Sequence, residues 1–280
     1  MGSFVEMLKR PGRASVIWLD SCDYAGRLLA GGAAPWLDVA AFVAWQRKAQ
    51  GLLKSSVVSL PVARVIAAWL EAHPELRETM AAKTRAVHPL KSLLSDEALR
   101  AHLVELTRGL RSGVGGVLAL TMPSPRAWVG LAYQQAHGEV VNVGEDEADS
   151  GSVYIADFLR AFGETGLDAL LLQEFGEPQP VSSEELRAYQ AVFNVAAHYR
   201  WDVGLRVPKL TQFSGDAPLP LAFVVAAESA PVGLPYGAAL AAEFWTDAAR
   251  PAVADVDFLF AEIPEDAEPE LVLDRLSGLS

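Results

Sequence analysis

Short apolar runs alternate with helical stretches along the whole chain of 280 residues, and this alternation constrains the fold more than any other feature. Eight runs have the composition of buried strands, at 14–19, 56–60, 117–121, 167–174, 201–207, 219–226, 243–246 and 256–263. Strands separated by helices are typical of parallel sheets with right-handed crossovers. Eight of them predict an α/β fold, a (β/α)8 TIM barrel in a single domain over residues 1–280, and a doubly wound open sheet is the alternative.

A helical insertion is expected between the second and third strands, at residues 62–113. This segment has an almost unbroken helical pattern, interrupted at Pro74 and Pro89, and is much longer than one strand-to-strand crossover requires. We expect it to form a cap or a side wall of the barrel.

The composition suits a globular protein that works away from membranes and nucleic acid. With 51% hydrophobic and 21% charged residues the chain can bury a large core, and no apolar run reaches the roughly 18–20 residues that a membrane span needs. A formal net charge of −12 opposes nonspecific nucleic-acid binding. The single cysteine, Cys22, suits a reducing compartment. We therefore expect a cytoplasmic protein.

The negative charge is unevenly distributed along the chain. Residues 1–140 carry 16 Lys and Arg against 11 Asp and Glu, whereas residues 141–280 carry 7 against 24. The acidic half is explained either by solvated helices or by a surface for a partner, and self-association into a homo-oligomer stays open.

Functional side chains of a (β/α)8 barrel gather where the strands end, on the loops that lead into the helices. Here these positions are rich in arginine, whose planar fork pairs with carboxylate or phosphate groups, so we expect a small anionic ligand. The substrate-binding candidates are Tyr24, Arg27, Ser124, Arg126, Trp128 and Arg206. The alternative is that the arginines only offset neighbouring acids, Arg27 with Asp23 and Arg206 with Asp202.

Acidic residues at the same strand ends are the candidates for proton transfer. Asp20 and Asp23 follow the first expected strand, and they would face Glu174, at the end of the fourth, or Glu262, in the eighth, across the barrel mouth. Asp20, Asp23 and Glu174 are the predicted catalytic groups, although carboxylates at strand ends often only hold loops. Cys22 fits a small buried side chain better than a nucleophile.

The sequence predicts neither a metal site nor a bound cofactor. None of the five histidines lies at the end of an expected strand, and a single cysteine cannot form a zinc cluster. The acidic run at 145–149 lacks the ligand spacing of an EF-hand and precedes a helix, where acids are favoured anyway. The glycines at 113–116 precede a strand instead of following one, so they cannot hold a pyrophosphate at the start of a helix.

Three segments resemble the superfamily of barrels that contains uroporphyrinogen decarboxylase and cobalamin-independent methionine synthase. Residues 25–28, AGRL, resemble the first-loop segment of the decarboxylases, whose arginine meets substrate carboxylates. The Pro-Ser-Pro turn at 123–125, with Trp128, looks like the loop after their third strand, and residues 154–174 are similar to their helix leading into strand four. The resemblance spans residues 14–207, mostly as an order of elements.

This resemblance implies a barrel with either lyase chemistry on a carboxylated substrate or methyl transfer. Leu60 and Pro61 stand where the decarboxylases end strand two with a catalytic aspartate, and one cysteine cannot supply the His-x-Cys zinc site of the methionine synthases. We therefore expect a metal-independent lyase or decarboxylase-like enzyme. The alternatives are a barrel without catalysis that serves binding or assembly, and a methyltransferase-like subunit that takes its cofactor from another chain.

Overall fold

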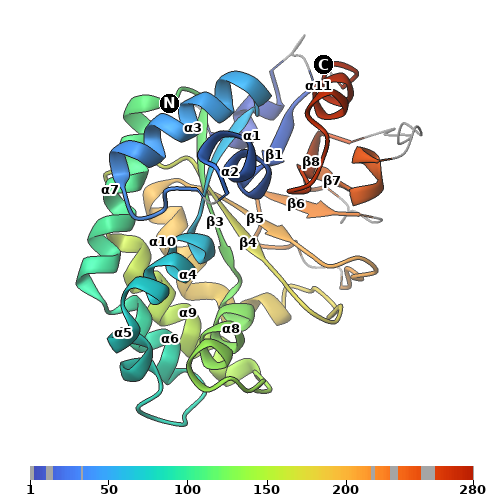
Figure 1. Ribbon diagram of the computed structural model, residues 1–280. Coiled ribbons are helices and arrows are strands. Elements are labelled where there is room, and N and C mark those ends of the chain that lie inside the picture. Colours follow the sequence, from blue (N-terminus) through green and yellow to red (C-terminus); the bar gives the residue numbers. More distant parts are fainter. Residues whose placement is uncertain are drawn as a thin grey trace.

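The computed structural model describes residues 3–10, 15–32, 34–215, 218–227, 233–246 and 256–279. Its centre is one sheet of eight parallel strands, around which helices are arranged (Figure 1). The strands are β1 (Ile17–Asp20), β2 (Val57–Pro61), β3 (Val117–Pro123), β4 (Ala169–Gln173), β5 (Asp202–Arg206), β6 (Phe223–Ala226), β7 (Tyr236–Leu240) and β8 (Phe258–Glu262). Neighbours follow chain order from β2 to β8, and β8 returns to β1. The fold is therefore a nearly closed TIM-like barrel, as the alternation predicts, and not a doubly wound open sheet.

The barrel has a seam between β1 and β2, where the described residues form no strand ladder. Serine side chains replace part of it. Ser56 Oγ accepts a hydrogen bond from the backbone nitrogen of Ile17 at 3.1 Å, and Ser55 Oγ accepts one from Leu19 at 3.0 Å. The backbone nitrogen of Ser56 donates to the carbonyl of Ile17 at 2.8 Å. Two residues that precede β2 thus close the ring.

Aromatic side chains fill the inside of the barrel. The inner cluster draws on the strands and on the short helix α1 (Phe4–Leu8), and its rings are at most 2% exposed: Phe4, Trp18, Phe223, Phe258 and Phe260. The Phe4 ring lies 5.4, 4.7 and 5.0 Å, centroid to centroid, from the rings of Trp18, Phe223 and Phe258. The centre of the barrel is therefore packed and leaves no channel.

Two glycines make room for these rings. A Cβ atom at Gly204 would lie 2.0 Å from the ring of Phe223, and one at Gly237 would lie 2.3 Å from the ring of Phe258. Since real Cβ atoms do not approach so closely, β5 and β7 need glycine where the neighbouring strand presents a phenyl ring.

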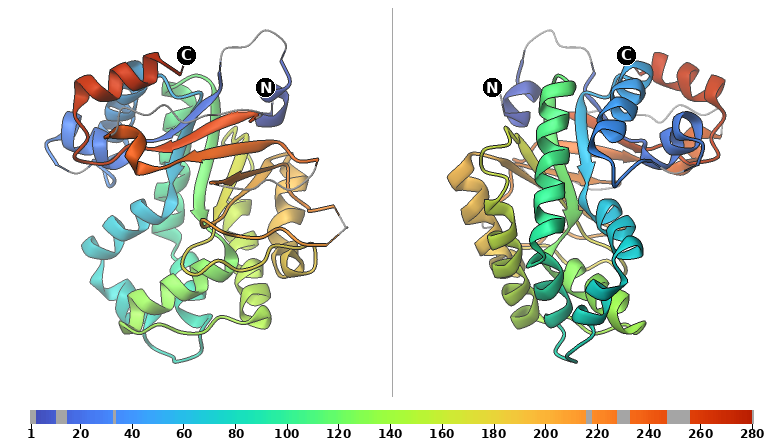
Figure 2. Two further views of the ribbon diagram at one scale, coloured as in Figure 1. Left: turned by 90° about the vertical axis from the view of Figure 1, so that its right-hand side faces the viewer. Right: turned by 60° about the vertical axis from the view of Figure 1, so that its left-hand side comes forward.

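Helices cover the sheet unevenly. The strands β1 to β4 are followed by α2 (Cys22–Ala30), α3 (Val39–Leu53), α4 (Val62–Ala72), α5 (Pro74–Met80), α6 (His88–Leu94), α7 (Glu97–Gly113), α8 (Pro125–His137), α9 (Glu145–Arg160), the 3-10 helix η1 (Glu185–Tyr189) and α10 (Gln190–Tyr199). After β5 and β6 the described residues form no helix, and the orange strands in the left view of Figure 2 lack such a cover. The 3-10 helix η2 (Ala242–Trp245) and α11 (Pro269–Ser277) follow β7 and β8. The helical stretch predicted at 62–113 corresponds to α4 to α7.

Two expectations about secondary structure were wrong. The seventh strand is Tyr236–Leu240, and the run at 243–246 that was expected as strand seven forms η2 instead. Phe244 and Trp245 bury their rings in the apolar cluster on the outer face of β1 and β8. Helix α9 begins at Glu145, so the acidic run at 145–149 forms its first residues and does not precede it.

No helix formed by the described residues is long and apolar enough to cross a membrane.

Candidate functional site

Five charged side chains meet at the carboxyl ends of the strands, in two neighbouring groups around β1 and β8. We call Asp20, Asp23, Arg64, Arg206 and Glu262 the mouth cluster. They come from β1, the start of α2, the start of α4, the end of β5 and the end of β8. The mouth of a TIM barrel is where active sites lie, so this cluster is the first candidate.

The arginines of the mouth cluster are already paired with acids of the same chain. Arg64 donates from both terminal nitrogens to Asp23, at 2.5 and 2.6 Å. Arg206 donates in the same way to Glu262, at 2.6 and 2.8 Å, and its guanidinium lies 4.7 Å from the centroid of the Phe260 ring. Both forks are therefore filled by bidentate partners.

Asp20 is the one carboxylate of the mouth cluster that does not form a bidentate pair with Arg64 or Arg206. Burial and the neighbouring charge of Glu262 raise its pKa, and the positive charges of Arg64 and Arg206 oppose this only in part. The carboxyl accepts a long hydrogen bond of 3.4 Å from the backbone nitrogen of Cys22. Burial and Asp20 together raise the pKa of the Cys22 thiol, which agrees with its expected role as a small buried side chain.

The space beside Asp20 is small. A cavity of about 20 Å³ lies at the seam, lined among others by Asp20, Ser59 and Thr121. That volume holds about one water molecule. With the barrel interior filled by rings, this cavity beside the mouth cluster is too small for a substrate.

A much larger cavity opens beside the ends of β3, β4 and β5, and we call it the rim cavity. Its volume is about 890 Å³. Its walls come from α8, the loop that follows β4, the helix η1 and the loop that follows β5. Most of its lining is apolar, and the apolar lining residues include Leu131, Val140, Val141, Val143, Phe175, Pro180, Val181, Leu186, Val207 and Pro208. A cavity of this size and lining is typical of small-molecule sites.

A tyrosine and a glutamate form the most closely coupled polar pair of the rim cavity. The Tyr189 hydroxyl donates to Glu174 Oε1 at 2.5 Å and lies 3.4 Å from the hydroxyl of Ser124. Burial and the negative charge of Glu174 raise the pKa of Tyr189 far above its ordinary value. The phenol therefore stays protonated, beside a carboxylate that can accept a proton.

Arg126 provides the cationic group of the rim cavity. It is the second residue of α8, whose start is capped by the Ser124 hydroxyl accepting from the backbone nitrogen of Ala127 at 3.1 Å. One of its terminal nitrogens contacts Glu185 at 3.3 Å. Its buried Nε has no acceptor among the described residues. With one long contact to an acid, the guanidinium of Arg126 is less fully used than the bidentate guanidinium groups of Arg64 and Arg206.

Six of the nine predicted site residues fall into two separate groups instead of one. Asp20, Asp23 and Arg206 belong to the mouth cluster. Ser124, Arg126 and Glu174 belong to the rim cavity and its support. Glu174 therefore pairs with Tyr189 and not with the first-strand acids.

The remaining three substrate-binding candidates lie in neither group. Arg27 donates to the backbone carbonyl of Ala267 at 2.8 Å. Tyr24 is 1% exposed and packs in the apolar cluster outside β1 and β8. Trp128 is 1% exposed and meets the Phe158 ring edge-on in the helix-side core. The structure thus gives the side chains of Tyr24 and Trp128 packing roles.

The two expected pairings of arginine with a neighbouring acid were also wrong in their partners. Asp23 pairs with Arg64 instead of Arg27, and Arg206 pairs with Glu262 instead of Asp202. Asp202 accepts a hydrogen bond from the backbone nitrogen of Val5 at 2.9 Å, at the opposite end of the barrel.

Sequence reasoning missed Tyr189 and Glu185, which lie on η1. The signal that could have found them is the long connection after the fourth strand, since loops of that length often fold over a site. The conformation of this connection could not be predicted from the sequence, because it depends on contacts with the loop after β5, such as the bridge between Val181 and Phe213.

The described residues contain no group of three or more His, Cys, Asp or Glu side chains placed to hold a metal ion. Comparison of the chain with protein-family models, with curated proteins and with solved structures found no match.

Proposed function

We propose that this protein is a barrel enzyme that binds a small carboxylated molecule in the rim cavity and performs lyase chemistry on it. The observation that carries the proposal is the combination of unused Arg126 donors with the Tyr189 and Glu174 pair in one large, mainly apolar cavity. In this proposal Arg126 binds the carboxylate of the substrate. The apolar part of the substrate lies against the valines that line the rim cavity.

Glu174 is the proton acceptor in this proposal, and Tyr189 orients it. The phenol, whose pKa is raised far above its ordinary value, keeps its proton and donates a hydrogen bond to Glu174, whose carboxylate takes up the proton that the substrate loses. Ser124 keeps the phenol in place through its hydroxyl. An elimination fits this arrangement, because one base removes a proton from the substrate while the leaving group departs with its bonding electrons. The lyase class is also what the resemblance to the decarboxylases implies, and a cytoplasmic location belongs to the same proposal.

The second candidate function is binding or assembly without catalysis. It is favoured by the mouth cluster, whose arginines are filled by their own acids beside a cavity of about 20 Å³. In this alternative the rim cavity binds a ligand and releases it unchanged.

A ligand screen by thermal unfolding tests the binding step. Small carboxylic acids with apolar bodies are added to the wild type, and a ligand at 100 times its dissociation constant is expected to add about 2.7 kcal/mol of stability. Arg126→Met should weaken this binding about 10- to 100-fold, because a charge-assisted hydrogen bond is lost. The matched control is Arg187→Met, since Arg187 is exposed on η1 and pairs with Glu184 at 2.6 Å. Equal loss in both variants, or no ligand for the wild type, would exclude the proposal.

The catalytic step is tested on whichever acid binds. Product formation is followed in the wild type and in Tyr189→Phe. The variant should bind the acid with unchanged affinity, and its turnover rate should be about 100-fold lower. A wild type that binds the acid and never converts it would instead support the second candidate.

A further inference from the structure

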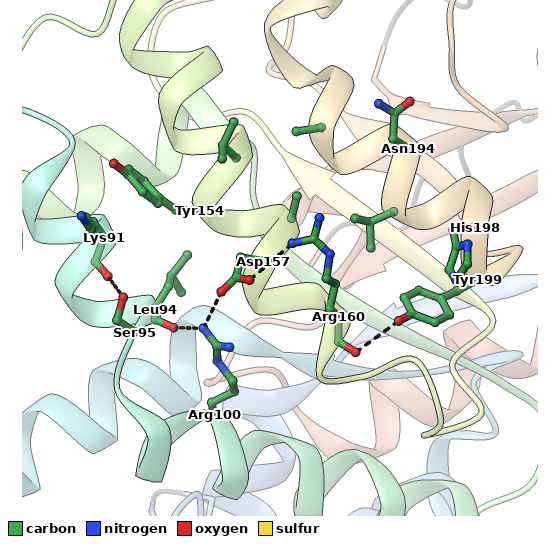
Figure 3. A pocket seen from close by; sticks show the side chains of 14 residues that line it. Lys91, Leu94, Ser95, Arg100, Tyr154, Asp157, Arg160, Asn194, His198 and Tyr199 are labelled. Carbon is green, nitrogen blue, oxygen red and sulfur yellow. Dashed lines mark hydrogen bonds and ion pairs between the residues drawn. The ribbon is translucent and has the colours of Figure 1, made fainter.

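A second concave surface, the outer groove, lies on the outer helices and shares no lining residue with the rim cavity (Figure 3). Its volume is about 970 Å³. Its walls come from α6, the start of α7, α9 and α10. Nothing in the proposed function uses this surface.

Positive charge gathers in the outer groove of a protein whose net charge is −12. The charged residues that line it are Lys91, Arg100, Arg160 and Asp157, so that three cations face one acid. The two arginines share that acid: Asp157 accepts from Arg100 at 3.2 Å and from Arg160 at 3.3 Å (Figure 3). One carboxylate thus serves two guanidinium groups, and two positive charges stay without a counter-charge among the described lining residues.

Helix ends account for where these cations lie, and not for their excess over acids. Lys91 lies in the last turn of α6 and Arg160 in the last turn of α9, where cations are favoured by the helix dipole. Arg100 is the fourth residue of α7, and its guanidinium reaches the carbonyl of Leu94 at the end of α6. Three cations therefore meet in one groove with a single acid.

The contacts of Arg100 point to a missing acceptor. One terminal nitrogen donates to the Leu94 carbonyl at 2.7 Å and also contacts Asp157. Its Nε is buried and has no acceptor among the described residues. Leu94 and Asp157 therefore do not use all the donors of the Arg100 guanidinium, and the excess positive charge of the groove favours an anion there.

We infer that the outer groove binds a small molecule that carries a phosphate group, with Arg100 and Arg160 on the phosphate and Lys91 beside it. A phosphate ester carries about −1.5 to −2 charges at pH 7, which matches the two cations left over, and it offers three acceptor oxygens to the arginine forks. Leu94, Val153 and Val195 line the same groove and provide apolar contacts for the rest of the molecule.

Calorimetric titration with inorganic pyrophosphate tests the inference on the full chain. The titration is run in 0.15 M NaCl, because this salt concentration screens long-range attraction between the anion and exposed surface charges. Arg160→Gln is the main variant, because the Arg160 side chain is 61% exposed and makes only a long hydrogen bond of 3.3 Å to Asp157 among the described residues, so the fold should tolerate the change. We expect it to weaken pyrophosphate binding about tenfold.

Asp157→Asn separates a ligand site from a purely structural charge group. If the arginines await an anion, removing the competing carboxylate should tighten pyrophosphate binding several-fold, roughly three- to tenfold. If they serve only to hold Asp157, the variant should bind no better than the wild type.

Two controls place the binding in the groove. Arg187→Gln, an exposed arginine outside the groove, should leave the titration unchanged, and Arg126→Met should do so as well, which separates this site from the rim cavity. The inference is overturned if 10 mM pyrophosphate, roughly the weakest affinity of interest, gives no binding to the wild type. It is equally overturned if Arg160→Gln and Asp157→Asn both titrate like the wild type.

Discussion

The mouth cluster and the rim cavity both place arginine beside carboxylates at the ends of strands, and they differ in how far each arginine is already satisfied. Arg206 uses two nitrogens on Glu262, and the space nearby holds about one water molecule. Arg126 makes one contact of 3.3 Å to Glu185 and faces a cavity of about 890 Å³. A guanidinium that is fully hydrogen-bonded, as in Arg206, connects β5 to β8, whereas one with unused donors can bind a ligand. To locate a binding site, it is therefore more useful to find arginines with unused donors than to count the arginines at strand ends.

The largest effect expected from this comparison is on stability at the mouth cluster. Arg206→Met should lower the free energy of unfolding by about 1.5–2 kcal/mol, since it removes two charge-assisted hydrogen bonds from a partly exposed pair. Urea denaturation measures the change, and Arg187→Met, in an exposed pair, should cost less than about 0.5 kcal/mol. Equal losses in the two variants would mean that the mouth pair is no stronger than an ordinary surface pair.

A smaller change in the free energy of unfolding, this time an increase, is expected when Asp20 is replaced. Its pKa is raised in the folded protein, so the folded state holds this proton more tightly than the unfolded state does. The stability that the proton gives is complete below the ordinary pKa of 3.8 and is lost as the pH rises through the folded value. Asp20→Asn avoids that loss and should raise the free energy of unfolding at pH 7 by less than Arg206→Met lowers it.

Urea unfolding of Asp20→Asn and the wild type at pH 4 and pH 7 checks the direction. The advantage of the variant should be greater at pH 7 than at pH 4. An advantage that does not change with pH would mean that the carboxyl has the same pKa in both states.

The smallest change in the free energy of unfolding is expected for Arg126, the arginine with the fewest hydrogen bonds in this comparison. Arg126→Met should change the free energy of unfolding by less than about 0.5 kcal/mol, because it removes one long contact to a half-exposed acid. Urea denaturation without ligand measures this. A loss as large as that of Arg206→Met would show Arg126 to be a structural residue and remove the difference between the two regions.

The barrel could be predicted from the sequence because most strands are continuous runs of branched or aromatic residues. Seven of the eight expected strands coincide with observed ones, with ends that differ by a few residues. The prediction of the seventh strand failed because its second residue, Gly237, is required by the Phe258 ring of the next strand and has poor strand propensity of its own. That requirement comes from a neighbour 21 residues away and is not local.

The candidate site was only partly predictable for the same reason. The rule that functional groups follow strand ends placed Asp20, Arg126, Glu174 and Arg206 at the correct end of the barrel. Which acid meets which arginine depends on strand register and on how loops fold back, as in the contact between Glu174 and Tyr189. Whether these residues act on a substrate stays a prediction.

The seam between β1 and β2 has a consequence for how the protein withstands handling and mutation. Without the hydroxyls of Ser55 and Ser56, the backbone nitrogens of Leu19 and Ile17 would lose their acceptors. The seam would then keep the backbone hydrogen bond from Ser56 to the Ile17 carbonyl and the bond from Trp18 Nε1 to Ser59 Oγ. The less protected edges of β1 and β2 would favour pairing between molecules and aggregation. Two small hydroxyl groups thus help to keep the barrel from recruiting its own copies.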